Sequence, residues 1–415
     1  ALFDEWKESV SATATELLKQ PIFRAEHEGR ELRADEWSSE LEGASISVNF
    51  SEELVLLIRE SKYLDRMGFT VPEAALNVTL QEDKYHKYVE SLRDMLSAHA
   101  ACLASLSPVE TELLRPRILE LRGSLEKGFK LLNWNSLSIP EFTESCSKAI
   151  ARFTARGKQI AKNTGIIQAT VDSIATIDLL KRPADDAEPQ ELVELYEELE
   201  KHRQAQLEGL VAQYHRIGPL LTQIEEKVVD TNKGRAPQMR SYYRHWERQV
   251  FDALNKMVLR ALATCRELLG DGPDGRTKPL FRVGTVLSAP EVLVSPPLAE
   301  VNKYLSKLLK SLVESTRSFV RWMDGTCLET PPQKVAGDDE EPVVFSFYND
   351  VIGNKEIVGA MVSVTRTIER TFGRVNKQLD QYRRYDQLWR VDKTQHLAKF
   401  EAQQPSVVQF DSRLQ

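Results

Sequence analysis

Residues 357–382 read IVGAMVSVTRTIERTFGRVNKQLDQY. Their apolar side chains recur every three or four positions and form a stripe of Ile357, Met361, Val364, Ile368, Phe372, Val375, Leu379 and Tyr382. This period places the stripe on one face of an α-helix. We expect a helix of about 45 residues in this region, which would span roughly 70 Å. A helix of that length must bury its stripe against other helices, because intrinsic propensity alone does not hold it.

The same period recurs in earlier stretches of the chain, within residues 54–64, 160–174 and 199–228. Repeated long runs of this kind predict an all-α protein, built as an elongated array of antiparallel helical bundles. Gly218-Pro219 interrupts the third stretch, so we expect a kink or a break in the helix there.

Several predicted helix starts share one motif, in which a Ser or Thr precedes a Glu by three positions and a Pro lies between them. The motif occurs at residues 70–73, 107–110 and 138–141. The hydroxyl accepts a hydrogen bond from the first turn, and the Glu reaches back to the capping residue. Proline in the first turn loses no hydrogen bond, so Pro189 and Pro297 are also expected to open helices.

Two segments depart from the helical pattern, residues 20–50 around Gly29 and residues 270–297 after a Gly-rich turn. Short extended pieces in them are residues 22–24 and 46–50 in the first segment and residues 281–283 and 292–294 in the second. Both segments predict small β-hairpins inserted into the helical body.

These patterns divide the chain into consecutive segments. They are residues 1–50, an opening helix and β-hairpin; 51–183, a helical bundle; 184–270, a second helical bundle; 271–296, a loop and β-hairpin; 297–327, a helix; 328–344, a linker rich in acidic residues and Pro; and 345–415, a long-helix bundle that continues beyond the chain. The chain starts without Met and stops without a closing signal, so we interpret it as part of something longer.

Composition excludes several classes of protein. Of the 415 residues, 41% are hydrophobic and 28% are charged, which is too apolar for a disordered chain and too charged for a membrane bundle. With 55 Lys and Arg against 62 Asp and Glu, the net charge is −7, which argues against a dedicated nucleic-acid binder. No apolar run approaches the ~20 residues that cross a bilayer. We therefore expect no nucleic-acid and no membrane partner.

Motifs for catalysis and metal binding are missing from the sequence. The four cysteines form no CxxC pair, as expected of reduced thiols in a cytosolic protein, and the seven histidines form no metal-binding spacing. Gly157-Lys158 lacks the preceding Gly of a phosphate loop, because Arg152 stands in its place. We expect no catalytic residue, no cofactor and no metal. An active site assembled from distant residues stays an alternative, which an ATPase or hydrolase assay would test.

The most distinctive candidate for partner binding is residues 240–248, which mix basic and aromatic side chains. Tyr242, Tyr243, Arg244 and Trp246 could stack on bases or anchor a protein partner. The simpler interpretation, which we favour, is a helix that buries Tyr243, Trp246 and Phe251 and leaves Arg240, Arg244 and Arg248 in solvent. Phe281 and Val283 in the second hairpin are further candidates, because a hairpin edge can accept a strand from a partner.

Blocks of sequence in a fixed order carry a stronger signal. They are VNFSEEL (48–54), RESKYL (59–64), GFTVP (68–72), PLFRV (279–283), PPL (296–298), FVRW (319–322), FYNDV (347–351), EIV (356–358), WRVDK (389–393) and PSVVQFD (405–411). Together they resemble the N-terminal tail of dynein heavy chains over nearly the whole chain. The later blocks are more similar to the axonemal branch than to the cytoplasmic one, and within it we favour an outer-arm chain.

The resemblance implies a central part of a very large motor subunit, whose ATPase ring and microtubule-binding stalk lie elsewhere. It implies a scaffold that binds WD-repeat intermediate chains, dynein light chains and other heavy chains. Through these, and through a docking complex, the tail would attach the motor to the doublet microtubule of a cilium or flagellum. The expected location is the cytoplasmic cytoskeleton of the axoneme. None of the family's catalytic motifs occurs here, so no catalytic residue is carried over.

The alternative is a helical rod of another class, such as a vesicle-tethering subunit or a spectrin-like scaffold. Spectrin should show a repeat near about 100 residues, and none is visible in the sequence. Tethering rods share the helical texture but not the ordered blocks.

Overall fold

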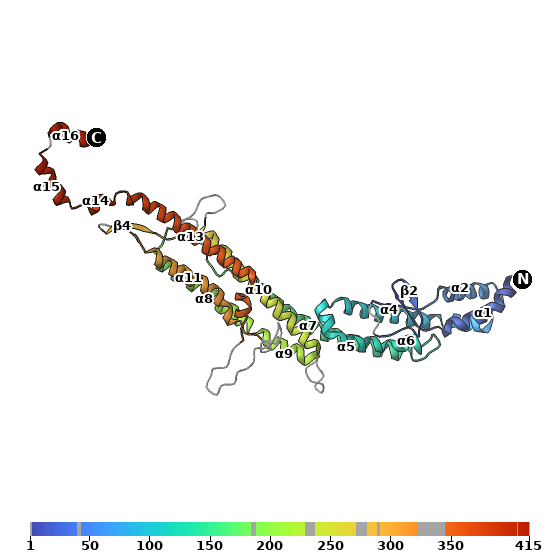
Figure 1. The fold of residues 1–415 in the computed structure, drawn as a ribbon. Helices are drawn as coiled ribbons and strands as arrows, with labels where there is room; N and C mark the ends of the chain where they lie inside the picture. Colours follow the sequence, from blue (N-terminus) through green and yellow to red (C-terminus); the bar gives the residue numbers. More distant parts are fainter. Residues whose placement is uncertain are drawn as a thin grey trace, which may run out of the picture. The chain divides into compact units, whose positions relative to one another are not determined.

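The structure is a computed structural model, and it describes residues 2–39, 43–183, 188–228, 237–270, 280–288, 291–321, 345–404 and 406–414. In this part of the chain the fold is all-α, with two small antiparallel sheets beside the helices (Figure 1). The chain divides into two compact units. The first is Ala1–Ile166 with Leu220–His245, and the second is Ile167–Pro219 with Trp246–Gln415.

The first unit contains a three-stranded sheet among helices. Its elements are α1 (Leu2–Lys19), β1 (Phe23–His27), β2 (Arg30–Leu32), β3 (Ser45–Val48), α2 (Glu52–Arg66), α3 (Glu73–Leu80), α4 (Glu82–Ala104), α5 (Pro108–Ser124) and α6 (Glu126–Lys130). Three further helices have residues in both units, namely α7 (Ile139–Thr176), α9 (Ile217–Val228) and α10 (Pro237–Leu269).

The second unit contains the remaining helices and a two-stranded hairpin. Its elements are α8 (Leu192–Tyr214), β4 (Gly284–Ser288), β5 (Glu291–Ser295), α11 (Leu298–Glu314), the 3₁₀ turn η1 (Ser315–Ser318), α12 (Tyr348–Ile352), α13 (Lys355–Arg383), α14 (Asp386–Arg390), α15 (Lys393–Gln403) and α16 (Val407–Leu414). Helices α8 and α11 contact each other, and α11 also contacts α12 and α13.

The sheet of the first unit has the strand order β2-β1-β3, and both pairings are antiparallel. The expected turn at Gly29 joins β1 to β2, and Gly29 has a φ of +78°, a conformation that suits glycine. The second expected piece becomes β3, which pairs Val48 with Phe23 of β1. The two predicted extended pieces therefore pair with each other, and β2 adds a third strand that the sequence did not predict.

Aromatic residues fill the core beneath this sheet. Phe23 packs its ring 5.5 Å from that of Phe129 and 5.9 Å from that of Phe142. Trp37 stacks on Phe129 at 4.1 Å between ring centroids. Trp134 is 1% exposed, and its Nε1 donates a hydrogen bond to the carbonyl of Asn49 at 2.8 Å. The sheet is thus held to α6 and α7 by rings that lie far apart in the sequence.

Helix α5 begins as the sequence predicts, with a complete capping box. The Ser107 hydroxyl accepts from the Glu110 amide at 3.3 Å, and the Glu110 carboxylate accepts from the Ser107 amide at 2.9 Å. The matching prediction for Thr70 is wrong. Helix α3 starts at Glu73 with Pro72 as its N-cap, and no side chain caps it. Pro72 has an extended ψ of 146°, and the residue before a proline is disfavoured from helical conformation, so Thr70 lies too far before the first helical residue to cap it.

The break predicted at Gly218-Pro219 is confirmed within a few residues, since α8 ends at Tyr214 and α9 begins at Ile217. Helix α11 opens after Pro297, as expected. Helix α8 begins later than its predicted start at Pro189, with Glu191 as its N-cap.

Helix α13 has the predicted apolar stripe but not the predicted length. Ile357, Val364, Ile368 and Leu379 are buried, while Tyr382 at the end of the stripe is 50% exposed. The helix is 29 residues long and ends at Arg383, so the expectation of about 45 residues is wrong. A short turn separates it from α14, which continues the chain.

The second predicted hairpin is present, but its first strand lies further along the chain. β4 begins at Gly284, after the predicted residues 281–283, and pairs with β5 across the whole of both strands. The polypeptide at Phe281 makes a single parallel bridge with Gln190 instead. The predicted linker, residues 328–344, lies outside the described residues.

Candidate partner-binding surfaces

Within the described ranges, no group of three or more His, Cys, Asp or Glu side chains could hold a metal ion. Cys102, Cys146 and Cys265 are free and buried. Burial raises the pKa of all three thiols, that of Cys265 to about 12, so they stay protonated and poorly nucleophilic. Cys327 lies outside the described residues. Among the described helices, none combines the length and the apolarity that crossing a bilayer requires.

The aromatic residues of the 240–248 segment are part of the protein interior. Tyr242 is 2% exposed, and its hydroxyl lies 2.9 Å from Thr164 Oγ1. Tyr243 is 7% exposed and donates a hydrogen bond to the Glu225 carboxylate at 2.8 Å. Trp246 is also buried, at 2%. In this structure, none of the three rings is available to a partner that binds from solvent.

The basic residues of the same segment lie on the surface. Arg240, Arg244 and Arg248 are all exposed, four residues apart along α10, and Phe251 is half-buried. This distribution agrees with the simpler interpretation of the sequence. Of the residues first considered for partner binding here, only Arg244 is presented to solvent.

The chain at the second hairpin is tied to the residues before α8. The Gln190 amide donates to the Leu280 carbonyl at 3.4 Å, and the Arg282 amide donates to the Gln190 carbonyl at 3.2 Å. Phe281 is half-buried as a result, while Val283 is 40% exposed. The two candidate residues therefore have different environments, and Val283 is the one that a partner can contact.

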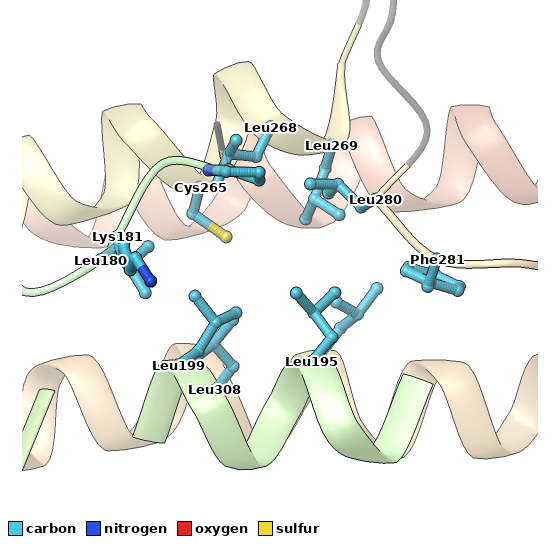
Figure 2. Close-up of a pocket in the computed structure, with 12 residues that line it drawn as sticks. Leu180, Lys181, Leu195, Leu199, Cys265, Leu268, Leu269, Leu280, Phe281 and Leu308 are labelled. Atoms are coloured by element: carbon cyan, nitrogen blue, oxygen red, sulfur yellow. The ribbon is translucent and has the colours of Figure 1, made fainter. Parts of the chain in front are cut away.

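Phe281 lines a small apolar cavity between α8, α10 and α11. Figure 2 shows Leu199 and Leu195 of α8 pointing across the cavity toward the side where Cys265 and Leu269 of α10 lie, with Phe281 at one end. The cavity has a volume of about 30 Å³, which is the space of a single water molecule. It is too small for a cofactor, so this part of the second unit is a hydrophobic core rather than a ligand site.

The β4–β5 hairpin exposes apolar side chains at its surface. Val286, Leu287 and Leu293 are 51%, 47% and 48% exposed. Among the described residues the sheet has only these two strands, so each has one edge without a strand partner. Unpaired strand edges with apolar side chains are typical places for strand addition.

An apolar surface near the start of the chain was not predicted from the sequence. We call it the N-terminal apolar patch, and it consists of Phe3, Trp6, Leu56, Tyr63, Met67 and Phe69. Leu56, Tyr63 and Met67 are 50%, 53% and 69% exposed and follow one face of α2. The opposite face of α2 is the buried one, with Leu54 and Leu57.

Two ring contacts and one hydrogen bond join the other residues of the N-terminal apolar patch to one another and to α2. Phe3 packs 4.8 Å from Phe69 and 5.9 Å from Trp6, measured between ring centroids. Trp6 Nε1 donates to the Glu60 carboxylate at 2.9 Å. Aromatic and Met side chains are the residues that protein interfaces favour. The only sequence signal was that α2 carries apolar residues on both faces.

Comparison with known proteins identifies relatives of the whole chain. The family described as "Dynein heavy chain, N-terminal region 1" matches residues 1–142. The chain is 45% identical, over 99% of its length, to the Dynein-1-alpha heavy chain of the flagellar inner arm I1 complex of Chlamydomonas reinhardtii. It is 36% identical, over 100% of its length, to human dynein axonemal heavy chain 10. In both comparisons the chain spans 9% of the relative.

The comparisons do not confirm the expectation of an outer-arm chain. The Dynein gamma chain of the flagellar outer arm of Chlamydomonas reinhardtii is 22% identical over 89% of this chain. That identity is about half of the 45% found for the inner-arm I1 relative.

Proposed function

This chain belongs to the axonemal dynein heavy chains, whose N-terminal tail region it matches, and from this we propose that it is a structural attachment segment of the inner-arm I1 type. The motor domain of such a heavy chain is absent from these 415 residues. The chain spans 9% of the relatives it matches, so the microtubule-motor ATPase activity of the parent chain is part of the proposal.

The partners that we propose are other dynein subunits: WD-repeat intermediate chains, light chains and neighbouring heavy chains. They would link the tail to the doublet microtubule of the axoneme. The observation that carries this proposal is the identity of 45% over 99% of the chain to a heavy chain named as part of the I1 complex. Capped helices and buried aromatic cores support it, because they suit a segment that transmits force without unfolding.

The N-terminal apolar patch is the surface we propose for at least one of these subunit contacts. Exposed contiguous apolar patches on a protein mark interaction sites. The test is the variant Leu56→Asp, Tyr63→Asp, Met67→Asp in the full-length heavy chain, expressed together with its intermediate and light chains. We expect the purified complex to lack at least one subunit, which a lower mass of the complex would show.

The matched control is Leu131→Asp with Leu137→Asp. These residues are 73% and 81% exposed and lie in the first unit outside the patch. The control should retain every subunit. If the patch variant also retains every subunit in stoichiometric amounts, the patch does not bind them. If the unmodified chain captures none, the proposed function itself is wrong.

The β4–β5 hairpin supports a second contact, by strand addition. Deleting residues 276–295 from the full-length chain should then remove a partner that pairs with this edge. Full partner binding by the deletion variant would refute the role of the hairpin and leave the patch unaffected.

A further inference from the structure

Residues of helices α4 and α7 line an open groove in the first unit, with a volume of about 620 Å³. Its floor is made of buried side chains, Met95 from α4 and Thr143 and Ile150 from α7. This volume lies within the roughly 300–1,000 Å³ of typical binding clefts. The groove is far from the N-terminal apolar patch in sequence and uses different helices.

Short side chains form the exposed walls of the groove. Ala98 lines it from α4, and Ser147, Ala151 and Ala155 line it from α7. Side chains of this size keep the two helix surfaces low, so a third helix can lie close against both backbones. The dimensions alone do not choose the occupant, and the charges along the groove do.

Lys158 is the one charged residue of α7 that lines the groove, and Lys162 follows it one helical turn later. Residues 145–166 contain no Asp or Glu, although the chain as a whole has a net charge of −7. The basic residues in this stretch are Lys148, Arg152, Arg156, Lys158 and Lys162. With no acidic residue on this stretch of α7, Lys158 and Lys162 favour a partner that places carboxylates opposite them.

Little of this positive charge is neutralised within the protein. Lys148 pairs with Glu144 at 2.6 Å, and Arg152 Nε donates only to a carbonyl of its own helix. Lys158, which lines the groove, and Lys162 form no ion pair with any residue that the structure describes. On the α4 side, exposed Asp94 also has no ion pair within the described ranges.

We propose that this groove binds an acidic amphipathic helix of another dynein subunit. The helix presents small apolar side chains to Met95 and Ile150, carboxylates to Lys158 and Lys162, and a Lys or Arg to Asp94. Helices recognised in grooves are anchored in this way by one apolar face, and the flanking charges set the orientation. The inference rests on the proposed function, since it names the chemistry of one partner of the tail.

The experiment places a photo-crosslinking amino acid, p-benzoylphenylalanine, at Ala155 of the full-length heavy chain co-expressed with its subunits. The matched control places it at Arg93, which is exposed on α4 and does not line the groove. We expect the Ala155 position alone to cross-link to one peptide of another subunit. That peptide should have helical apolar spacing and more Asp and Glu than Lys and Arg.

Charge reversal distinguishes electrostatic recognition from simple proximity. Lys158→Glu with Lys162→Glu should lower the cross-linking yield about tenfold, because two favourable charge pairs are replaced by repulsion. Lys7→Glu with Lys19→Glu, an equal charge change on α1, should leave the yield unchanged.

The outcomes separate the two proposals. A cross-link to the heavy chain itself, to a basic peptide or to nothing, in a complex that still contains its subunits, overturns the groove and leaves the proposed function standing. An equal loss of cross-linking yield in both charge-reversal variants also overturns the proposal that the groove binds an acidic helix. Failure of every subunit to co-purify overturns both.

Discussion

Gly128 occupies a position where a side chain has no room. A Cβ atom added there would lie 2.3 Å from Cδ2 and 2.4 Å from Cε2 of Phe23. Phe23 is 1% exposed and packed against Phe129 and Phe142, so its ring cannot move aside freely. The residue is therefore required by the packing of α6 against β1 rather than by the backbone conformation of the helix.

We predict that Gly128→Ala lowers the free energy of unfolding by about 1–3 kcal/mol, the usual cost of overpacking a core. Urea unfolding followed by circular dichroism measures the change. Gly123→Ala is the matched control, because a Cβ at Gly123 has nothing within 4 Å. It should stabilise the protein by up to about 1 kcal/mol through helix propensity. Equal changes in unfolding free energy for the two substitutions would mean that the Phe23 ring moves aside and makes room for the added Cβ.

His99 makes stability depend on pH. Burial, with a contribution from the cation of Arg122, lowers the pKa of His99 to about 4. Its Nε2 has no hydrogen-bond partner in the structure, and the residue is 5% exposed. Because the folded state then binds fewer protons than the unfolded state, the stability is fully present above pH 6.5. It is lost as the pH falls toward 4.

We predict that His99 alone removes about 2 kcal/mol of stability between pH 7 and pH 5. His99→Leu should reduce the pH dependence of the unfolding free energy by that amount, measured by urea titrations at both pH values. His86→Leu, at an exposed position of the same helix, should leave the dependence as it is. A pH dependence that survives in His99→Leu would assign it to other groups.

At the scale of the helix, the structure separates two capping motifs that look alike in the sequence. Ser107 forms a capping box with Glu110, whereas Thr70 forms no cap. Ser107→Ala should therefore cost about 1 kcal/mol of unfolding free energy, and Thr70→Ala should change it by less than about 0.5 kcal/mol. Thermal unfolding of both variants compares them directly. A larger loss for Thr70→Ala would contradict the cap assignment.

Local signals in the sequence predict helices, and non-local pairing limits the prediction of sheets. The stripe of α13 and the cap of α5 depend on residues a few positions apart, so they could be predicted. The pairing of β1 with β3 joins the two extended pieces that the sequence predicts, whereas β2 has a single apolar residue, Leu32, and no local pattern marks it as a strand. The end of α13 at Arg383 is likewise not marked by Gly or Pro.

The candidate site shows the same limit. Exposed charges at Arg240, Arg244 and Arg248 follow from the helical period alone. Whether Tyr242 and Trp246 face a partner or the interior depends on tertiary packing, and the structure buries both. The N-terminal apolar patch and the α4–α7 groove are formed by segments distant in sequence, so only the fold reveals them.

At the scale of the whole molecule, the last described helices carry apolar residues that this chain does not cover. α14 and α15 contain no buried residue. Leu397, Val407, Val408 and Phe410 are 57%, 77%, 78% and 42% exposed, and the ring of Phe410 packs 5.7 Å from that of Phe400. The relatives of the chain are much longer, since it spans 9% of their length.

We predict that residues 393–414 are covered by other parts of the heavy chain, because exposed apolar side chains gain about 25 cal/mol per Å² when they are buried. Hydrogen–deuterium exchange should show slower exchange for these residues in the full-length heavy chain than in the 415-residue chain. Helix α5, whose apolar residues Leu113, Leu114, Ile118 and Leu121 are already buried, provides the internal reference and should exchange equally in both. Equal exchange of residues 393–414 in the two proteins would instead assign their apolar side chains to contacts with separate subunits, which adding those subunits to the full-length chain would then reveal.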